Sequence, residues 1–138
     1  MKLTVSLLAA STLLAQAGFV PSPHFDTDPP QLPDDLKPGG VLIFSKTNGF
    51  RDEPAMQAST AALVAIAKTR NWPVFATENG AVMNAGQLGK FKVVIWNNTS
   101  GDTLNADQRA AFKTWLELEM VIAVAFGNGG DDGDVVAL

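Results

Sequence analysis

The stretch GVLIFSKTNGFR, residues 40–51, contains a short apolar run followed at once by polar and glycine residues. The run itself, VLIFS at residues 41–45, is continuously apolar through Phe44 rather than alternating, which is typical of a parallel strand buried on both faces. A second stretch, VVIWNNTSGD at residues 93–102, has the same arrangement of an apolar run and a polar loop. The two stretches predict two buried strands of a parallel sheet, each ending in a polar loop.

Two helices are predicted between and after these strands. The first spans residues 54–70, with Pro54 in the first turn, where a missing backbone N–H is tolerated. The second begins after Asn105, with Gln108 three residues on as in a capping box. Residues 84–90 form at most a short helix. Apolar residues recur at helical spacing in both long helices: Ala58, Ala61, Ala62, Ala65 and Ile66 in the first, and Ala111, Phe112, Trp115 and Leu116 in the second.

Residues 73–77 and 121–126 read as two further strands, before the glycine-rich turn at residues 127–130. Strands that alternate with helices predict a parallel sheet with right-handed crossovers and helices on both faces. We therefore expect an α/β fold, a flavodoxin-like three-layer sandwich with strand order 2-1-3-4, incomplete at its C-terminus. Trp96 and Trp115 are expected in its core. The fourth strand is apolar and nothing after it is long enough to cover it, which predicts self-association through that strand.

The first 40 residues have a different character. Lys2, an apolar run over residues 3–14 and the small-x-small site Ala15-Gln16-Ala17 are typical of a cleaved signal peptide, residues 1–17. Residues 18–40 hold six of the eight prolines and read as a spacer or lead-in arm. The α/β domain then covers residues 41–138. We expect a periplasmic or secreted protein that has no membrane anchor after cleavage.

Composition excludes several kinds of chemistry. The chain has a net charge of −4 and no cysteine, so it offers no basic surface for nucleic acid, no disulfide and no thiolate ligand. Its one histidine, His24, lies in the proline-rich segment and is assigned no role. Ser45 and Ser100 therefore have no histidine base for a Ser/His/Asp triad. We expect no metal and no cofactor.

Ligands of doubly wound sheets bind beyond the carboxyl ends of the strands, where the strand order reverses. In order 2-1-3-4 that point lies between the first and third strands, so the loops 45–51 and 97–102 meet there. Lys46, Thr47 and Arg51 could bind a sugar or an anion, or they could simply form a solvated loop. The donors and acceptors of residues 97–100 suit a hydroxyl-rich ligand, or else Thr99 and Ser100 only satisfy backbone groups of the loop. Asp102 is expected to serve the loop structure rather than the ligand. The candidate ligand-binding residues are Lys46, Thr47, Arg51, Asn97, Asn98, Thr99 and Ser100.

These same residues resemble a known family. FSKTNGFR at residues 44–51 is similar to the first-strand motif of the ThuA-like (trehalose-utilisation) family, a branch of the class I glutamine-amidotransferase-like fold. VIWNNTSGD at residues 94–102, followed by Leu104 and QRAAF at residues 108–112, is similar to its third strand and next helix. The resemblance covers residues 40 to about 118. It implies the flavodoxin-like fold and a role in sugar metabolism.

The chain also departs from that family pattern. Asp52 stands where the family usually carries a histidine, and Phe126 stands where the related amidotransferases place their nucleophilic cysteine. Whether the protein is an enzyme therefore stays open. One reading is an exported ThuA-like protein of trehalose or related carbohydrate metabolism, which binds a polyhydroxylated ligand at the C-terminal edge of the sheet. The alternative is a non-catalytic binding module or truncated remnant without the histidine motifs.

Overall fold

The structure is a computed structural model that describes residues 23–118 and 122–126. The predicted signal peptide at residues 1–17 and the turn at residues 127–130 lie outside the described residues. The elements, in chain order, are β1 (Gly40–Phe44), α1 (Glu53–Thr69), β2 (Val74–Thr77), the 3₁₀ helix η1 (Gly80–Val82), α2 (Ala85–Leu88), β3 (Phe91–Asn97), α3 (Ala106–Leu118) and β4 (Ile122–Phe126).

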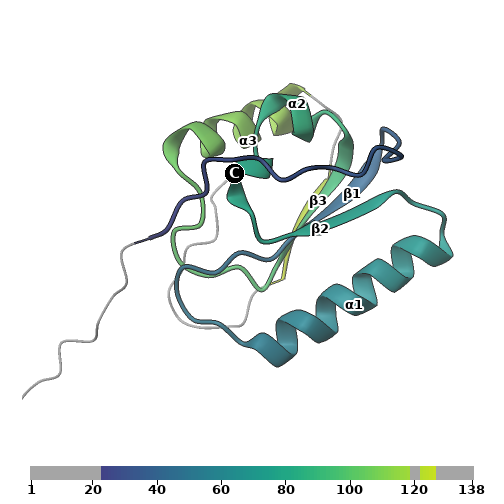
Figure 1. Cartoon of the computed structure of the whole chain (residues 1–138), viewed down its shortest axis with the longest axis horizontal. Coiled ribbons are helices and arrows are strands. Elements are labelled where there is room, and N and C mark those ends of the chain that lie inside the picture. Colours follow the sequence, from purple (N-terminus) through teal and green to yellow (C-terminus); the bar gives the residue numbers. More distant parts are fainter. Residues whose placement is uncertain (1–22, 119–121, 127–138) are drawn as a thin grey trace, which may run out of the picture.

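The four strands form one parallel sheet in the order β2-β1-β3-β4 (Figure 1). This confirms the predicted order and the flavodoxin-like α/β fold. Strand β1 pairs with β2 on one side and β3 on the other, so Phe44 lies level with Thr77 and Trp96. The carboxyl ends of β1 and β3 are therefore adjacent. The chain continues from β1 to α1 on one side of the sheet and from β3 to α3 on the other.

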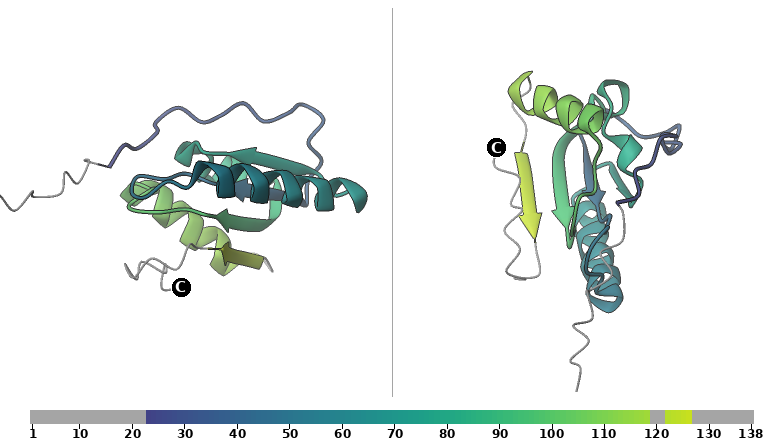
Figure 2. Two further views of the ribbon diagram at one scale, coloured as in Figure 1. Left: turned by 90° about the horizontal axis from the view of Figure 1, so that it is seen from below. Right: turned by 90° about the vertical axis from the view of Figure 1, so that its left-hand side faces the viewer.

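The helices lie on both sides of the sheet. Figure 1 shows α1 on one side of the strands and α2 with α3 on the other, and Figure 2 shows the same layers from two further directions. Because side chains of a strand alternate between its faces, Leu42 and Phe44 pack under α2 and α3, whereas Val41 and Ile43 point to the α1 side. All four are buried, as the continuous apolar run predicts.

Aromatic side chains link β1, β3 and α3 within the core. The ring of Trp96 meets Phe44 edge-on at 5.1 Å and Phe112 at 5.2 Å, and Phe112 stacks on Trp115 at 5.6 Å. Such pairs contribute about 0.5–1.5 kcal/mol each beyond the area they bury. The prediction that Trp96 and Trp115 are core residues is confirmed. The predicted capping box of α3 is confirmed too, since Asn105 and Gln108 each accept the other's backbone N–H.

The predicted apolar face of α1 is not the face that covers the sheet. The positions at helical spacing are exposed, including Ile66 at 51 %. Met56 and Ala67 are the buried residues of this helix, and Ser59 and Thr60 are half-buried beside them. The alanine side chain has little apolar area, so burying it contributes little free energy and its periodicity does not identify the covered face.

In the described part of the proline-rich segment, residues 23–39, there is no helix or strand, yet this part lies against the domain (Figure 1, purple). Its backbone carbonyls accept hydrogen bonds from side-chain amides of the domain, and Leu32 and Leu36 pack against the core. We call residues 23–38 the arm. The carbonyl contacts run from Gln108 to Asp26 at 2.7 Å, from Asn79 to Asp28 at 2.9 Å and from Gln87 to Pro30 at 2.7 Å.

Candidate functional site

The loops that follow β1 and β3 are joined to one another, as the topology predicts. Thr47 and Ser100 form an isolated parallel bridge, and the backbone N–H groups of Asn48 and Gly49 donate to the Ser100 carbonyl at 2.8 and 3.2 Å. The Ser100 hydroxyl in turn donates to the carbonyl of Phe50. The two loops therefore form one rigid unit at the carboxyl edge of the sheet.

Two residues with positive φ make this close approach of the loops feasible. Gly101 has φ of +68°, and a Cβ placed on it would lie 2.7 Å from the backbone nitrogen of Gly49. Asn98 has φ of +52°, a conformation that asparagine tolerates better than most residues. The unusual backbone at Asn98 turns the chain immediately after β3 and brings its side chain over α1.

On the α1 side of the sheet edge, amides and hydroxyls form a connected cluster. The Asn97 side chain is fully buried, and its Nδ2 donates to Ser45 Oγ at 3.1 Å and to Thr60 Oγ1 at 2.9 Å. The Asn98 Nδ2 donates to Ser59 Oγ at 3.0 Å and to Asn97 Oδ1 at 3.1 Å. We call Ser45, Ser59, Thr60, Asn97 and Asn98 the amide–hydroxyl cluster. Each of its hydroxyls retains acceptor capacity beyond these bonds.

Arg51 connects this region to two carboxylates. Its Nη1 and Nη2 donate to Glu78 at 2.7 and 3.0 Å, its Nε donates to Glu53 at 2.5 Å, and its Nη1 also reaches Thr47 Oγ1 at 3.3 Å. The hydrogen bonds to Glu78 and Glu53 raise the pKa of Arg51, and the bond from Arg51 lowers the pKa of Glu53. The guanidinium is thus fixed and charged beside the loops, although the group is partly exposed and salt will weaken these pairs.

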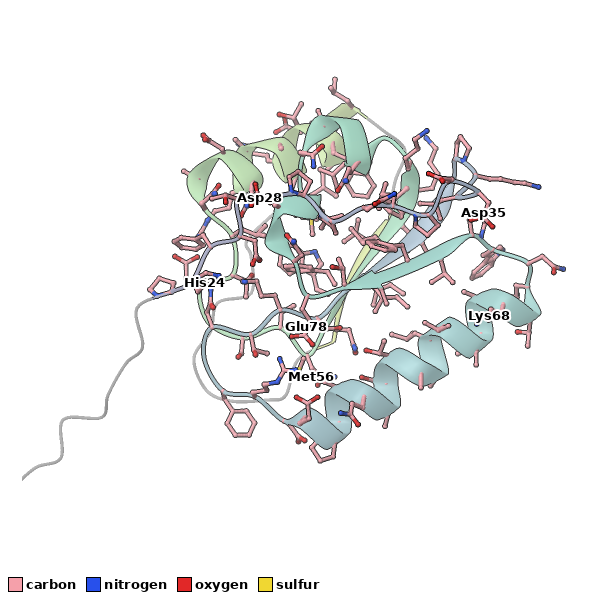
Figure 3. All side chains as sticks on the ribbon, viewed as in Figure 1. His24, Asp28, Asp35, Met56, Lys68 and Glu78 are labelled. Atoms are coloured by element: carbon pink, nitrogen blue, oxygen red, sulfur yellow. The ribbon has the colours of Figure 1, made fainter. Side chains whose placement is uncertain are left out.

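An open pocket of about 330 Å³ lies between α1 and the ends of β1 and β2. Ligand pockets typically measure about 300–1,000 Å³, so this one could take a ligand no larger than a disaccharide. Ser45 and Thr60 of the amide–hydroxyl cluster open into it. Figure 3 shows Met56 and Glu78 close together beside the first turns of α1, at this pocket. The lining residues are Ser45, Glu53, Met56, Gln57, Thr60, Ala61 and Glu78.

Asp52, which replaces the histidine of the family pattern, has a structural task. Its Oδ1 accepts the backbone N–H of Ala55 at 3.1 Å, so it is the N-cap of α1. Its negative charge at a helix start is also electrostatically favourable. Phe126, at the other departure, pairs through its backbone with Asn97. Asp52 therefore stabilises the helix that carries the pocket.

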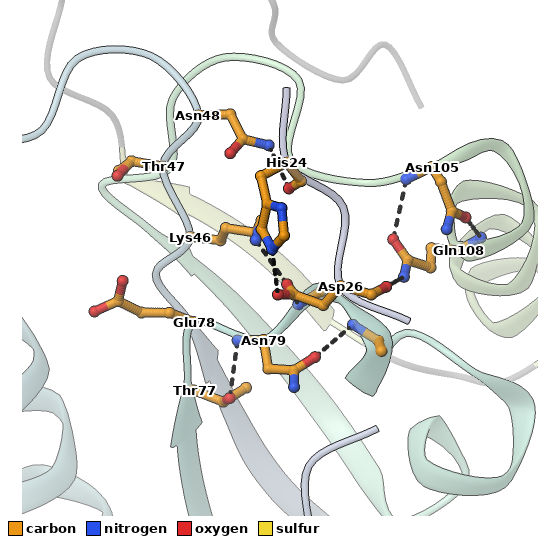
Figure 4. A network of polar contacts seen from close by, with 12 residues as sticks. His24, Asp26, Lys46, Thr47, Asn48, Thr77, Glu78, Asn79, Asn105 and Gln108 are labelled. Carbon is orange, nitrogen blue, oxygen red and sulfur yellow. Dashed lines mark hydrogen bonds and ion pairs between the residues drawn. The ribbon is translucent and has the colours of Figure 1, made fainter. Parts of the chain in front are cut away.

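Lys46 lies apart from the other candidate residues. Its side chain is buried, with 9 % exposed, and its Nζ lies 2.6 Å from the Asp26 carboxylate of the arm (Figure 4). Asn48 likewise faces the arm, donating to the His24 carbonyl at 2.9 Å and to the Asp102 carbonyl at 2.6 Å. Because consecutive residues after β1 point to opposite sides, the structure divides the predicted set between the α1 side and the arm side.

The remaining predicted residues lie in the joined loops. Thr47 and Ser100 hold the loops together, and Thr99 is half-buried between them. Asp102 forms an ion pair with Arg109 of α3, in keeping with the structural task expected of it. Sequence reasoning missed Ser59 and Thr60 as members of the cluster, and Glu53 and Glu78 as partners of Arg51. The signal available for the first two was a Ser-Thr pair in an alanine-rich helix.

The described residues lack both a metal-binding cluster and a membrane-spanning helix. Across residues 23–118 and 122–126, no group of three or more His, Asp or Glu side chains is arranged to hold a metal ion. In that same part of the chain, no helix has the length and apolar character needed to cross a membrane.

Comparison with known proteins supplies the family. The family model described as "Trehalose utilisation", ThuA, matches residues 40–128, which includes every element from β1 to β4. A search of curated proteins found no match, and a search of solved structures found none either. The family match spans well over half of the chain and coincides with the α/β domain seen here. The chain therefore belongs to the trehalose-utilisation (ThuA) family.

Proposed function

We propose that this ThuA-family protein, whose domain implies a function related to trehalose utilisation, acts by binding a sugar in the pocket between α1 and the ends of β1 and β2. The observation that carries the proposal is the buried Asn97 amide at the point where the strand order reverses. A fully buried amide at a sheet edge is costly unless it is held by partners, and here the partners are hydroxyls that also line a pocket.

The chemistry of the pocket suits a neutral polyhydroxylated ligand. Sugar hydroxyls both donate and accept, so they pair with the hydroxyls of Ser45 and Thr60, the amide of Gln57 and the carboxylates of Glu53 and Glu78. Arg51 holds both carboxylates in place, which reduces the ordering that a ligand would have to impose. Positioned acceptors of this kind give specificity for hydroxyl groups.

Binding without covalent catalysis is the mode that the site favours. The Ser45 hydroxyl is paired with Asn97 and lies 3.5 Å from Thr60 Oγ1, rather than beside an imidazole. The single histidine of the sequence is on the arm, with its side chain 81 % exposed. Asp52 is engaged at the start of α1. These observations support a non-catalytic binding module, which the alternative reading of the sequence offered beside a truncated remnant, and we propose that the module binds the sugar of the first reading.

Export is a second part of the proposal. The residues 1–17 have the charged start, apolar run and small-x-small site of a signal peptide, and they precede the arm. Secretion in a suitable host followed by N-terminal sequencing should give a mature protein that begins at Gly18. Soluble cytoplasmic protein that retains Met1 would overturn this part and leave the sugar site unaffected.

The binding proposal can be tested by filling the pocket from α1. Ala61 and its neighbour Ala62 are both exposed on α1, but only Ala61 lines the pocket. In calorimetric titrations with a panel of disaccharides that includes trehalose, Ala61→Phe should abolish binding and Ala62→Phe should leave it intact. Equal binding by both variants would place the site elsewhere. A wild-type protein that binds none of the sugars would refute the proposed function.

A further inference from the structure

The arm is held to the domain by contacts that resemble those of a bound ligand. Five of its sixteen residues are prolines, which have no backbone N–H, and the domain contacts the arm with side-chain amides that donate to its carbonyls. Asn48 adds a fourth such contact, to the His24 carbonyl. Figure 4 shows His24 and Asp26 of the arm beside Asn48 and Gln108 of the domain. The amide donors come from the loop after β1, the η1 and α2 region and α3, so the arm lies over a surface made by several elements.

The carboxylate of Asp26 connects the arm to the domain through two hydrogen bonds. Its Oδ2 accepts from Lys46 Nζ at 2.6 Å and from the backbone N–H of Gly80 at 2.7 Å. Its Oδ1 faces His24 Nε2 at 3.7 Å. The Asp26 side chain is 21 % exposed and that of Lys46 is 9 % exposed, so an anion here is well shielded from water. Figure 4 shows Lys46 and Asp26 pointing toward one another across the gap between the domain and the arm.

The two donors of this site belong to the domain, whereas the carboxylate that they bind belongs to the arm. Lys46 is the second residue after β1 and Gly80 begins η1, whereas Asp26 comes from the arm, twenty residues before Lys46. A lysine ammonium buried to this extent is strongly destabilising unless an anion accompanies it. The domain therefore presents a preformed cation and a backbone donor that an outside anion must satisfy.

We propose that Lys46 and the Gly80 N–H form a carboxylate-binding site, and that Asp26 is a tethered ligand which competes with free carboxylates for it. The group that both donors bind here is a carboxylate, through its Oδ2, whereas a phosphate would leave more of its oxygens without a donor. The site lies on the opposite side of the sheet edge from the sugar pocket and does not depend on it. It would take the carboxylate of a small acid or of an acidic peptide that displaces the arm.

Tethering explains why the arm holds the site in the absence of another anion. A segment attached by a short linker acts at an effective concentration in the millimolar range, so a free carboxylate must exceed that concentration or bind more tightly. Removing the Asp26 carboxylate eliminates the competitor and leaves the two donors in place. A small carboxylate should then fill the vacated position.

The test is chemical rescue by acetate of the full mature chain carrying Asp26→Ala. Thermal unfolding is followed as sodium acetate replaces sodium chloride at constant ionic strength, so that screening does not change. We expect a saturable rise of about 5 °C in the midpoint for Asp26→Ala. Wild type should show no saturable rise. Asp28→Ala should behave like wild type, since Asp28 is exposed and contacts the domain through its carbonyl.

Further variants make every outcome informative. Asp26→Ala/Lys46→Met should lose the acetate response, and a response that persists there would place the anion site elsewhere and overturn the proposal. An Asp26→Ala response to phosphate but not to acetate would overturn the assignment to carboxylates. No response at all would show that the Lys46–Asp26 pair has only a structural task. Should Asp26→Ala fail to fold in chloride, recovery of folding by acetate is the same rescue, and Asp26→Ser provides a milder variant for the same titration.

Discussion

The Lys46 ammonium lies 2.6 Å from the Asp26 carboxylate, so a residue predicted to bind ligand is paired with the segment that precedes the domain. This ion pair lies on one side of the sheet edge, and the amide–hydroxyl cluster lies on the other. Lys46 faces the arm, and Asn97 and Asn98 face α1 and the pocket. We propose that the C-terminal edge of the sheet carries two sites of different chemistry, one for an anion and one for hydroxyl groups.

The ion pair predicts a dependence of stability on pH. Burial alone would raise the pKa of Asp26, but the hydrogen bond from Lys46, the Gly80 N–H and the nearby charges together lower it below the ordinary value of 3.8. A carboxyl with a lower pKa in the folded state stabilises the fold above its unfolded pKa, and this contribution is lost as pH falls through the folded pKa. As the pH falls below about 4, wild type should therefore lose stability more steeply than Asp26→Asn.

Urea unfolding across this pH range is the measurement. At neutral pH, Asp26→Asn should be less stable than wild type by about 1–3 kcal/mol, because Lys46 stays buried without its anion. Asp28→Asn is the matched control, since it removes the same charge from an exposed residue of the arm. Parallel pH profiles for wild type and Asp26→Asn would contradict this account of the pair.

Gly101 predicts a localised effect on the joined loops. Alanine there would have to adopt φ near +68° and place its Cβ 2.7 Å from the Gly49 nitrogen, so Gly101→Ala should cost about 2–4 kcal/mol. Gly86→Ala is the control, because a Cβ at that position of α2 meets Asn84 Oδ1 at an ordinary 3.5 Å. It should change stability by less than about 1 kcal/mol, in the stabilising direction. A similar loss in both variants would show that the close loop approach does not matter.

Arg51 and Asn98 predict changes in sugar affinity with little change in fold. Arg51→Ala removes an exposed guanidinium and leaves Glu53 and Glu78 without their common partner. Asn98→Gly retains the positive φ while deleting the amide that reaches Ser59. Each should weaken a bound disaccharide by about 1–3 kcal/mol in calorimetric titrations. Arg109→Ala, which removes a guanidinium paired with Asp102, should bind like wild type.

The sheet was predictable from the sequence because its signal is local. The apolar runs at residues 41–44 and 93–96 could be buried only as central strands, and their polar ends identified the loops that meet. The Asn105–Gln108 capping box was equally local. Residues within a few positions of one another set these features, so no knowledge of distant contacts was needed.

The covered face of α1 and the attachment of the arm could not be predicted in the same way. Alanine carries too little apolar surface to mark a face, so Ser59 and Thr60 were not identified as facing the sheet. The arm contacts the domain through backbone carbonyls. Every residue has a carbonyl, so no side-chain pattern in the sequence predicts which of them form these contacts. Lys46 pairs with Asp26, which lies twenty residues earlier in the chain, and no local sequence pattern indicates so distant a partner.

The central claim is that a sugar binds on the α1 side of the sheet edge, and amide chemical-shift mapping tests it most directly. Isotope-labelled mature protein is titrated with trehalose and with other disaccharides while backbone and side-chain amide signals are followed. We predict saturable shifts at Gln57, Thr60, Asn97 and Asn98, with the signals of Asp26 and Gly80 on the arm side unchanged. Saturable shifts confined to the arm side, or no saturable shift with any sugar, would contradict the claim.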